Sequence, residues 1–190
     1  MRRIVLASGS PRRIEMMKKN GYTPEIFPAD IDESLPDGIA MKEAVMFLAL
    51  KKALWVEEQL TGPASIIIAA DTVVYKDGIL GKPVDKEDAR RMLELIKNTD
   101  HYVATGVAII DQETGIKKLF CDATRVFCKN YSPAELEAYL NTKEPYDKAG
   151  AYGIQGIFGK YIDHYEGAFD TVVGFPWKIV GKELESLTKK

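Results

Sequence analysis

Two adjacent arginines follow a short turn near the start of the chain, in the stretch ASGSPRR at residues 7–13. Ser10 is a favoured N-cap residue and Pro11 suits the first helical position, so Arg12 and Arg13 are expected in a helix's first turn. A helix N-terminus already carries partial positive charge, which repels cations. A bound anion would relieve this repulsion, and phosphate is the natural candidate. The alternative is that both arginines simply lie in solvent.

Two carboxylates are candidates for holding a divalent metal ion. Asp71 follows the apolar run SIIIAA at 65–70 and is expected at the carboxyl end of a buried central strand, where α/β proteins bind ligands. A turn or N-cap aspartate is the alternative. Glu33 lies beside Asp32 in an acidic loop, and such loops are most often solvated surface. Together, Glu33 and Asp71 suit Mg²⁺, which takes one or two carboxylates plus phosphate oxygens of a substrate.

Two lysines and a glycine-rich segment complete the candidate residues. Lys82 lies between glycine and proline in GKP at 81–83, a setting that suits a fixed phosphate contact, although a surface lysine is the alternative. Lys52 lies among apolar residues of a predicted long helix. The segment EPYDKAGAYGIQG at 144–156 combines glycines with an amide. Such loops bring backbone close to a ligand, but each is weak evidence by itself.

The composition narrows the class of protein. The chain has 190 residues, of which 46% are hydrophobic and 28% charged, as in an ordinary globular protein of one domain, residues 1–190. Its net charge of −2 argues against non-specific binding of duplex nucleic acid. No apolar run approaches the roughly 18 residues of a membrane span, and the apolar N-terminal stretch is too short for a signal peptide. We therefore expect a cytoplasmic protein that does not associate with membranes.

The cysteines and histidines are expected to be structural. Cys121 and Cys128 lie in one strand-like segment at an odd separation, which directs their side chains to opposite faces. His101 and His164 are far apart in sequence and show no zinc-like spacing.

Hydrophobic periodicity and capping signals predict the strands and helices that would position these residues. The mixture of strand–helix units and long hairpins predicts an α/β fold with a mixed sheet. Residues 148–175 are expected to be irregular. The predicted strands are 3–8, 24–28 and 65–70, then a further strand and turn directly after residue 70, and two long strands joined by a turn at 111–115. The predicted helices are 11–20, 39–60 and 86–97, a helix capped by Ser132 and a last helix after Pro176.

A set of motifs occurs in order along nearly the whole chain. They are ASGSPRR at 7–13, IDES at 31–34, LALKKA at 48–53, AADTVV at 69–74, GKP at 81–83, ATGVAI at 104–109 and DKAGAYGIQG at 147–156. This set closely resembles the Maf family of nucleoside triphosphate pyrophosphatases, from residue 4 to about 185. SPRR and AADTVV are moderately specific singly, whereas the complete set in register is highly specific.

The resemblance implies an activity and a fold. Maf proteins hydrolyse a nucleoside triphosphate between the α and β phosphates, which gives a monophosphate and pyrophosphate and serves to clear non-canonical nucleotides. The implied fold is an elongated mixed sheet flanked by helices, with two lobes around a deep cleft, as in ITPase-like proteins. A divalent cation (Mg²⁺ or Mn²⁺) and a homodimer are also implied.

The resemblance also assigns roles to residues. Asp71 matches the family's proton acceptor, with Glu33 and Lys82 as further catalytic residues and Glu33 and Asp71 as metal ligands. An aspartate of ordinary pKa, about 4, is a poor base at neutral pH, so Asp71 is better suited to positioning a water whose pKa a metal lowers. The residues that would hold the triphosphate are Arg13, Lys52 and Lys82, together with Ser8, Ser10 and the backbone N–H groups of their turn.

The expected base specificity rests on three residues. The combination of Arg12, Thr72 and Gln155 resembles the subfamily acting on dTTP and UTP, not the one acting on methylated guanine nucleotides. The Gln155 amide offers one donor and one acceptor, which match O4 and N3–H of thymine or uracil. Cytosine presents the reversed pattern, so an amide held in place would discriminate against it.

Two other functions remain open from the sequence. A nucleotidyltransferase also presents arginine to phosphates from a glycine-rich turn, but it would need an acceptor, and hydrolysis alone releases free monophosphate. A nucleotide-sensing regulator of cell division would bind tightly with negligible turnover, and Maf proteins are associated with septum formation. The charged groups around Asp71 favour the hydrolase, because a pure binder has no need of an activated water.

Overall fold

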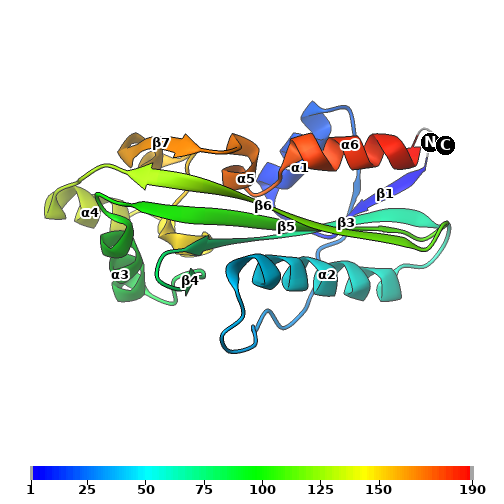
Figure 1. The fold of residues 1–190 in the computed structure, drawn as a ribbon, viewed down its shortest axis with the longest axis horizontal. Helices are drawn as coiled ribbons and strands as arrows, with labels where there is room; N and C mark the ends of the chain where they lie inside the picture. The colour runs from blue at the N-terminus through cyan, green and yellow to red at the C-terminus, as the bar shows by residue number, and fades with distance from the viewer. Residues whose placement is uncertain (1, 189–190) are drawn as a thin grey trace. The chain divides into compact units, whose positions relative to one another are not determined.

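The computed structural model describes residues 2–188 and shows a seven-stranded mixed sheet flanked by helices (Figure 1). The strands are β1 (Arg3–Leu6), β2 (Glu25–Ile26), β3 (Ser65–Tyr75), β4 (Ile79–Leu80), β5 (Asp100–Asp111), β6 (Ile116–Cys128) and β7 (Ile162–Glu166). The helices are α1 (Pro11–Lys19), α2 (Met41–Gln59), α3 (Lys86–Ile96), α4 (Pro133–Leu140), α5 (Phe169–Val173) and α6 (Trp177–Thr188), with short 3₁₀ helices η1 (Pro145–Asp147), η2 (Ala149–Ala151) and η3 (Ile157–Tyr161).

The sheet combines parallel and antiparallel pairs, which confirms the predicted fold class. Its strand order is β2-β1-β3-β5-β6-β7, and β4 pairs with β3 outside this order. Strand β1 runs parallel to β2 and β3, whereas β4 is antiparallel to β3 and β7 is antiparallel to β6.

Capping signals in the sequence correctly placed two helix starts. The Asp85 side chain accepts a hydrogen bond from the Asp88 N–H at 2.8 Å and begins α3. The predicted capping box at α4 is complete, because Ser132 and Glu135 each accept a hydrogen bond from the other's backbone N–H. The long hairpin of β5 and β6 and the closing helix α6 are also confirmed.

Two predictions about strands are wrong. Asp71 does not end its strand, because β3 continues to Tyr75 through Thr72, Val73 and Val74, whose β-branched side chains favour extended backbone. Residues 148–175 are not irregular throughout, since they contain β7 and α5. Strand β7 is exposed after its first residue, so it lacks the alternating hydrophobic pattern by which strands are found in a sequence.

Contacts between residues divide the chain into two compact units. The first contains the residues up to Asp71, Thr105–Asp122 and those from Gly174 onward. The second contains Thr72–Ala104 and Ala123–Val173. The single domain expected from the sequence stays a prediction, as does the cleft that the resemblance implies.

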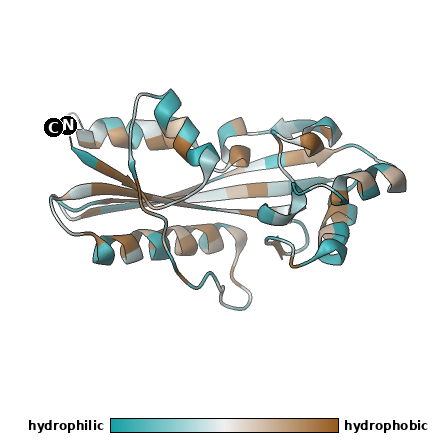
Figure 2. Ribbon diagram, turned by 180° about the vertical axis from the view of Figure 1, so that it is seen from behind, coloured by the Kyte–Doolittle hydropathy of each residue, from teal (hydrophilic) through white to brown (hydrophobic). Residues whose placement is uncertain are grey.

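In the first unit, β1, β3 and the part of β5 from Thr105 onward are buried on both faces, and alternate residues face opposite helices. On one face, Leu6 and Ile68 pack with Val180 and Leu184 of α6, and Met17 of α1 joins the same cluster. On the other, Ile67 and Ala69 pack with Ala49, Ala53 and Val56 of α2. Figure 2 shows hydrophobic residues both in the strands and in the helices.

Helix α2 lies unusually close to the sheet at one point. A Cβ atom at Gly106 of β5 would lie closer than 3.0 Å to the backbone of Val45 in α2, a separation that real Cβ atoms essentially never show. Glycine therefore permits this approach, which brings the residues of α2 against β3 and β5.

The second unit has its own hydrophobic core. Residues of α3 and α4 pack there against Val74, Val103 and Val126 of the strands and against the fully buried Phe158 of η3. Among the residues that the structure describes, no helix is long and apolar enough to cross a membrane.

Candidate active site

The two predicted metal-binding carboxylates lie on either side of one lysine. Asp71 is on the same face of β3 as Ile67 and Ala69, so its side chain points toward α2. The Lys52 ammonium of α2 lies 2.6 Å from Asp71 Oδ1 and 2.8 Å from Glu33 Oε1. The structure therefore brings together three residues that are far apart in sequence.

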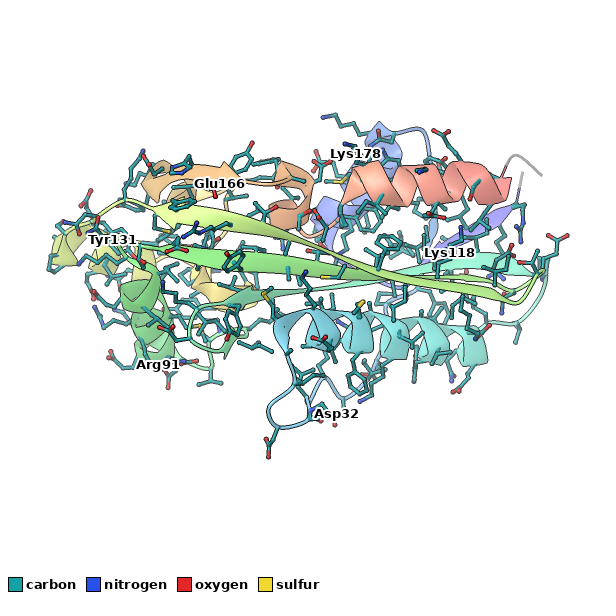
Figure 3. The ribbon with its side chains drawn as sticks, viewed as in Figure 1. Asp32, Arg91, Lys118, Tyr131, Glu166 and Lys178 are labelled. Atoms are coloured by element: carbon teal, nitrogen blue, oxygen red, sulfur yellow. The ribbon has the colours of Figure 1, made fainter. Side chains whose placement is uncertain are left out.

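This ion cluster is partly removed from water. Lys52 is 9% exposed and Asp71 is 7% exposed, whereas Glu33 reaches in from the acidic loop before α2. Figure 3 labels Asp32 in this loop, where the backbone carbonyl of Asp32 accepts a hydrogen bond from Lys51. Buried charges are tolerated where they are paired, and here one ammonium is shared by two carboxylates. The three groups together leave one excess negative charge.

The excess negative charge fits a metal ion that binds together with substrate. Within residues 2–188, no group of three or more His, Cys, Asp or Glu residues is arranged to hold a metal ion. Two carboxylates nevertheless suffice for Mg²⁺ when phosphate oxygens and waters supply its other ligands. The donor set therefore suits a divalent cation brought in with a phosphate compound, and it does not suit a resident metal held by protein alone.

The Arg13 guanidinium is held by two protein oxygens. Its Nε–H donates to the Gly174 carbonyl at 2.9 Å and its Nη1–H donates to Ser8 Oγ at 3.0 Å. Ser8 Oγ also accepts the Ser10 N–H at 3.2 Å. Ser10 is the N-cap residue of α1 as predicted, but its side chain makes no capping hydrogen bond. The turn therefore orients Arg13 through Ser8.

Arg13 interacts electrostatically with both carboxylates of the ion cluster. Burial lowers the pKa of Arg13 to about 10. The negative charges of Asp71 and Glu33 oppose this shift, whereas the positive charge of neighbouring Arg12 adds to it. The side chain thus stays cationic at neutral pH, although its burial makes the charged form less favourable than it would be in water. An anion bound here would offset that cost.

The other predicted site residues belong to the second unit. Thr72 is partly buried on β3, and Lys82 is exposed in the loop between β4 and α3. This loop is joined to the glycine-rich segment, because the Gly150 N–H donates to the Gly81 carbonyl at 3.0 Å. Gly150 has φ +66°, and a Cβ atom there would lie 2.7 Å from Val74 Cγ2, so the segment lies directly against β3.

Gln155 occupies the third position of a tight turn. The Gly156 N–H donates to the Gly153 carbonyl at 3.1 Å, which closes the turn, and the Gln155 side chain is exposed. Thr72, Lys82 and Gln155 thus lie in the second unit, whereas Ser8, Ser10, Arg12, Arg13, Glu33, Lys52 and Asp71 lie in the first.

Two features of the site were not predicted from the sequence. Lys52 was assigned to phosphate alone, but its ammonium contacts both carboxylates. The carbonyl of Gly174 was not recognised as a partner of Arg13. The sequence signal for a special backbone position here is the glycine in VVGFP. In the structure this Gly174 has φ +100°, a value that L side chains disfavour.

Comparison with known proteins identifies relatives along nearly the whole chain. The family described as "Maf-like protein" matches residues 3–187. A dTTP/UTP pyrophosphatase of Caldicellulosiruptor bescii is 44% identical over 179 residues, which is 93% of this chain and 90% of that protein. A dTTP/UTP pyrophosphatase of Acetivibrio thermocellus is 42% identical over 181 residues, again 93% of this chain and 90% of the relative.

A solved structure supports the fold independently. The Ham1 protein of Staphylococcus aureus superposes with a TM-score of 0.55 at 14% sequence identity, over 98% of this chain and 100% of that one. At this identity the likeness concerns the fold alone. The match to the family over residues 3–187 and the relatives of more than 40% identity establish that the chain belongs to the Maf family.

Proposed function

We propose that this chain hydrolyses nucleoside triphosphates, with dTTP and UTP preferred, to nucleoside monophosphate and pyrophosphate. The observation that carries the proposal is the cluster of Lys52 with Glu33 and Asp71 in the electrostatic field of Arg13. The names of the matched relatives agree with it. Removal of non-canonical nucleotides and assembly into a homodimer stay predictions from the resemblance.

Each charged group has a proposed role toward the triphosphate. Arg13 contacts phosphate oxygens in a direction set by Ser8 and Gly174, and the backbone N–H groups of the ASGSP turn add further donors. Lys82 contributes a second cation. Glu33 and Asp71 would hold a divalent cation with the substrate, and the cation would neutralise phosphate charge.

Asp71 is the proposed acceptor of the water's proton. Hydrolysis adds water across the anhydride between the α and β phosphates, and a carboxylate in hydrogen-bond reach orients the attacking oxygen. Lys52 donates to Asp71 Oδ1 at 2.6 Å, so it holds this carboxylate in one orientation. Lys52 thereby acts on the reaction through Asp71 as well as on the phosphates by its charge.

The direct test is a panel of nucleoside triphosphates incubated with the purified protein and Mg²⁺. We expect pyrophosphate and nucleoside monophosphate in equal amounts, with dTTP and UTP turned over faster than CTP, GTP or methylated GTP. Orthophosphate as the primary product would contradict the pyrophosphatase assignment. Faster turnover of guanine nucleotides would contradict the base preference alone, and tight binding without turnover would favour the regulatory role.

Replacing Gln155 with alanine should reduce the preference for UTP over CTP. The change removes the amide donor and acceptor that we assign to the base edge, so the kcat/KM ratio of the two substrates should fall by at least about tenfold. Discrimination between dTTP and UTP should change little, since their pairing edges are alike. The control is Gln59→Ala at the exposed end of α2, which should leave the ratio unchanged. An unchanged ratio in Gln155→Ala would exclude Gln155 from base recognition.

A further inference from the structure

We infer that Glu144 is a positioning residue for base selection, because its carboxylate holds the turn that presents Gln155. This inference rests on the proposed function of Gln155. Glu144 lies between α4 and η1, within the second unit, and is partly buried. It contacts the residues directly after the turn and has no assigned part in the phosphate chemistry.

The Glu144 carboxylate accepts hydrogen bonds at the start of η3. The Ile157 N–H donates to Oε2 at 2.7 Å and the Phe158 N–H donates to Oε1 at 3.3 Å. The first N–H groups of a helix have no partner within it, so an external acceptor is needed at this end. Because Gln155 precedes Ile157 by only two residues, these bonds also fix the exit of the Gly153–Gly156 turn.

The carboxylate and the turn are in direct contact. A Cβ atom at Gly156 would lie closer than 3.0 Å to all three carboxylate atoms of Glu144, and such a separation essentially never occurs. Gly156 itself has φ −103°, a value open to any residue. Glycine is therefore required here by the space that Glu144 occupies and not by the backbone conformation.

Glu144 is itself held by the core of the second unit. The Tyr139 hydroxyl lies 3.1 Å from Glu144 Oε1 and 3.2 Å from the Ala151 carbonyl, so it stands between the carboxylate and the segment before the turn. Lys148 Nζ donates to the Glu144 carbonyl at 3.0 Å. Tyr139 and Phe158 are both buried, and their ring centroids lie 5.1 Å apart.

The far side of the turn is anchored as well. Tyr152, which precedes it, is buried, and its hydroxyl lies 2.6 Å from His101 Nε2. Burial lowers the pKa of His101 to about 4, so this imidazole is neutral at neutral pH and the contact does not depend on its charge. Glu144 is thus an ionisable side chain in contact with Gly156, the last residue of the turn. Base selection needs an amide held in one orientation, which a loosened exit would not provide.

The test is the variant Glu144→Gln, assayed with UTP and CTP. Its amide has one acceptor oxygen for two backbone N–H groups and places an NH₂ donor against one of them. We expect the kcat/KM ratio of UTP over CTP to fall by about tenfold while pyrophosphate remains the product. A matched control is Glu137→Gln in α4, whose carboxylate bonds Lys86 and Arg90. This control should lose thermal stability without a change in the ratio.

The double variant Glu144→Gln/Gln155→Ala separates positioning from a general structural effect. If Glu144 acts through Gln155, adding Glu144→Gln to Gln155→Ala should change the ratio by less than about twofold. Should Glu144→Gln keep the wild-type ratio while Gln155→Ala loses it, the inference is overturned and the proposed function stands. If both single variants keep the ratio, base recognition by Gln155 and this inference fail together.

A second variant keeps the test usable if Glu144→Gln does not fold. Gly156→Ala is compatible with the observed backbone but displaces the carboxylate by steric contact. It should lower the UTP over CTP ratio to a similar extent. A folded Gly156→Ala protein with the wild-type ratio would overturn the inference.

Discussion

Replacing Asp71 with asparagine is expected to lower kcat for dTTP and UTP by at least about a hundredfold. The amide has nearly the same shape but no negative charge, so it can neither accept the proton of a water nor assist in holding a divalent cation. Lys52 would keep Glu33 as a charged partner at 2.8 Å, so the fold should be retained. Steady-state rates of pyrophosphate release at saturating substrate measure the effect.

A second buried carboxylate provides the control for this variant. Asp111 ends β5, is 1% exposed and bonds Arg2 and Thr114, and hydrogen bonds from these groups hold its pKa below the usual range. Its folded pKa is depressed, so its contribution to stability is present at neutral pH and is lost on acidification. Asp111→Asn should therefore unfold more easily but keep kcat. Near-wild-type turnover in Asp71→Asn would remove Asp71 from the proposed mechanism.

Local signals in the sequence were sufficient for most of the fold. The wholly apolar SIIIAA run predicted a strand buried on both faces, and α2 and α6 do cover opposite faces of β3. Capping residues placed the starts of α3 and α4, because these bonds form between residues close in sequence. Hydrophobic periodicity and capping are both properties of short windows.

Strand ends and edge strands were not predictable in the same way. The sequence predicts a separate strand and turn over DTVVYKDGIL, residues 71–80, although the chain runs as one strand from Ser65 to Tyr75. The continuation of β3 beyond Asp71 depends on pairing with other strands, such as the pairing of Val74 with Leu80 of β4. Strand β7 forms because β6 offers an edge for it, and its own exposed residues carry no periodic signal.

The site was predictable as a set of residues but not as a set of contacts. Family motifs selected Glu33, Lys52 and Asp71, yet nothing in the sequence states that the lysine lies between the two carboxylates. Lys52 is 19 positions from each of its partners, so only the packing of α2 on β3 brings them together. The bond between Arg13 and the Gly174 carbonyl spans 161 positions and likewise depends on tertiary structure.

Replacing Arg13 with alanine is expected to lower kcat/KM for dTTP and UTP by about a hundredfold or more. The variant loses a cation held by the Gly174 carbonyl and Ser8 Oγ, at 2.9 and 3.0 Å, in a fixed direction. Arg13→Lys should recover only part of the loss, since an ammonium lacks the planar fork that contacts both oxygens and a phosphate together. Because the pKa of Arg13 is about 10, the loss should be similar at about pH 6 and about pH 8.

Thermal unfolding with pyrophosphate gives a measurement independent of turnover. Burial disfavours the charged form of Arg13 in the free protein, and a bound anion offsets that penalty, so pyrophosphate should raise the Tm of the wild type. Arg13→Ala should show a much smaller increase. Lys19→Ala, an exposed change in the last turn of the same helix, should match the wild type in both assays. If Arg13→Ala keeps the wild-type kcat/KM and the full increase in Tm, the triphosphate binds elsewhere, and Arg13 serves only to link α1 to Ser8 and the Gly174 carbonyl.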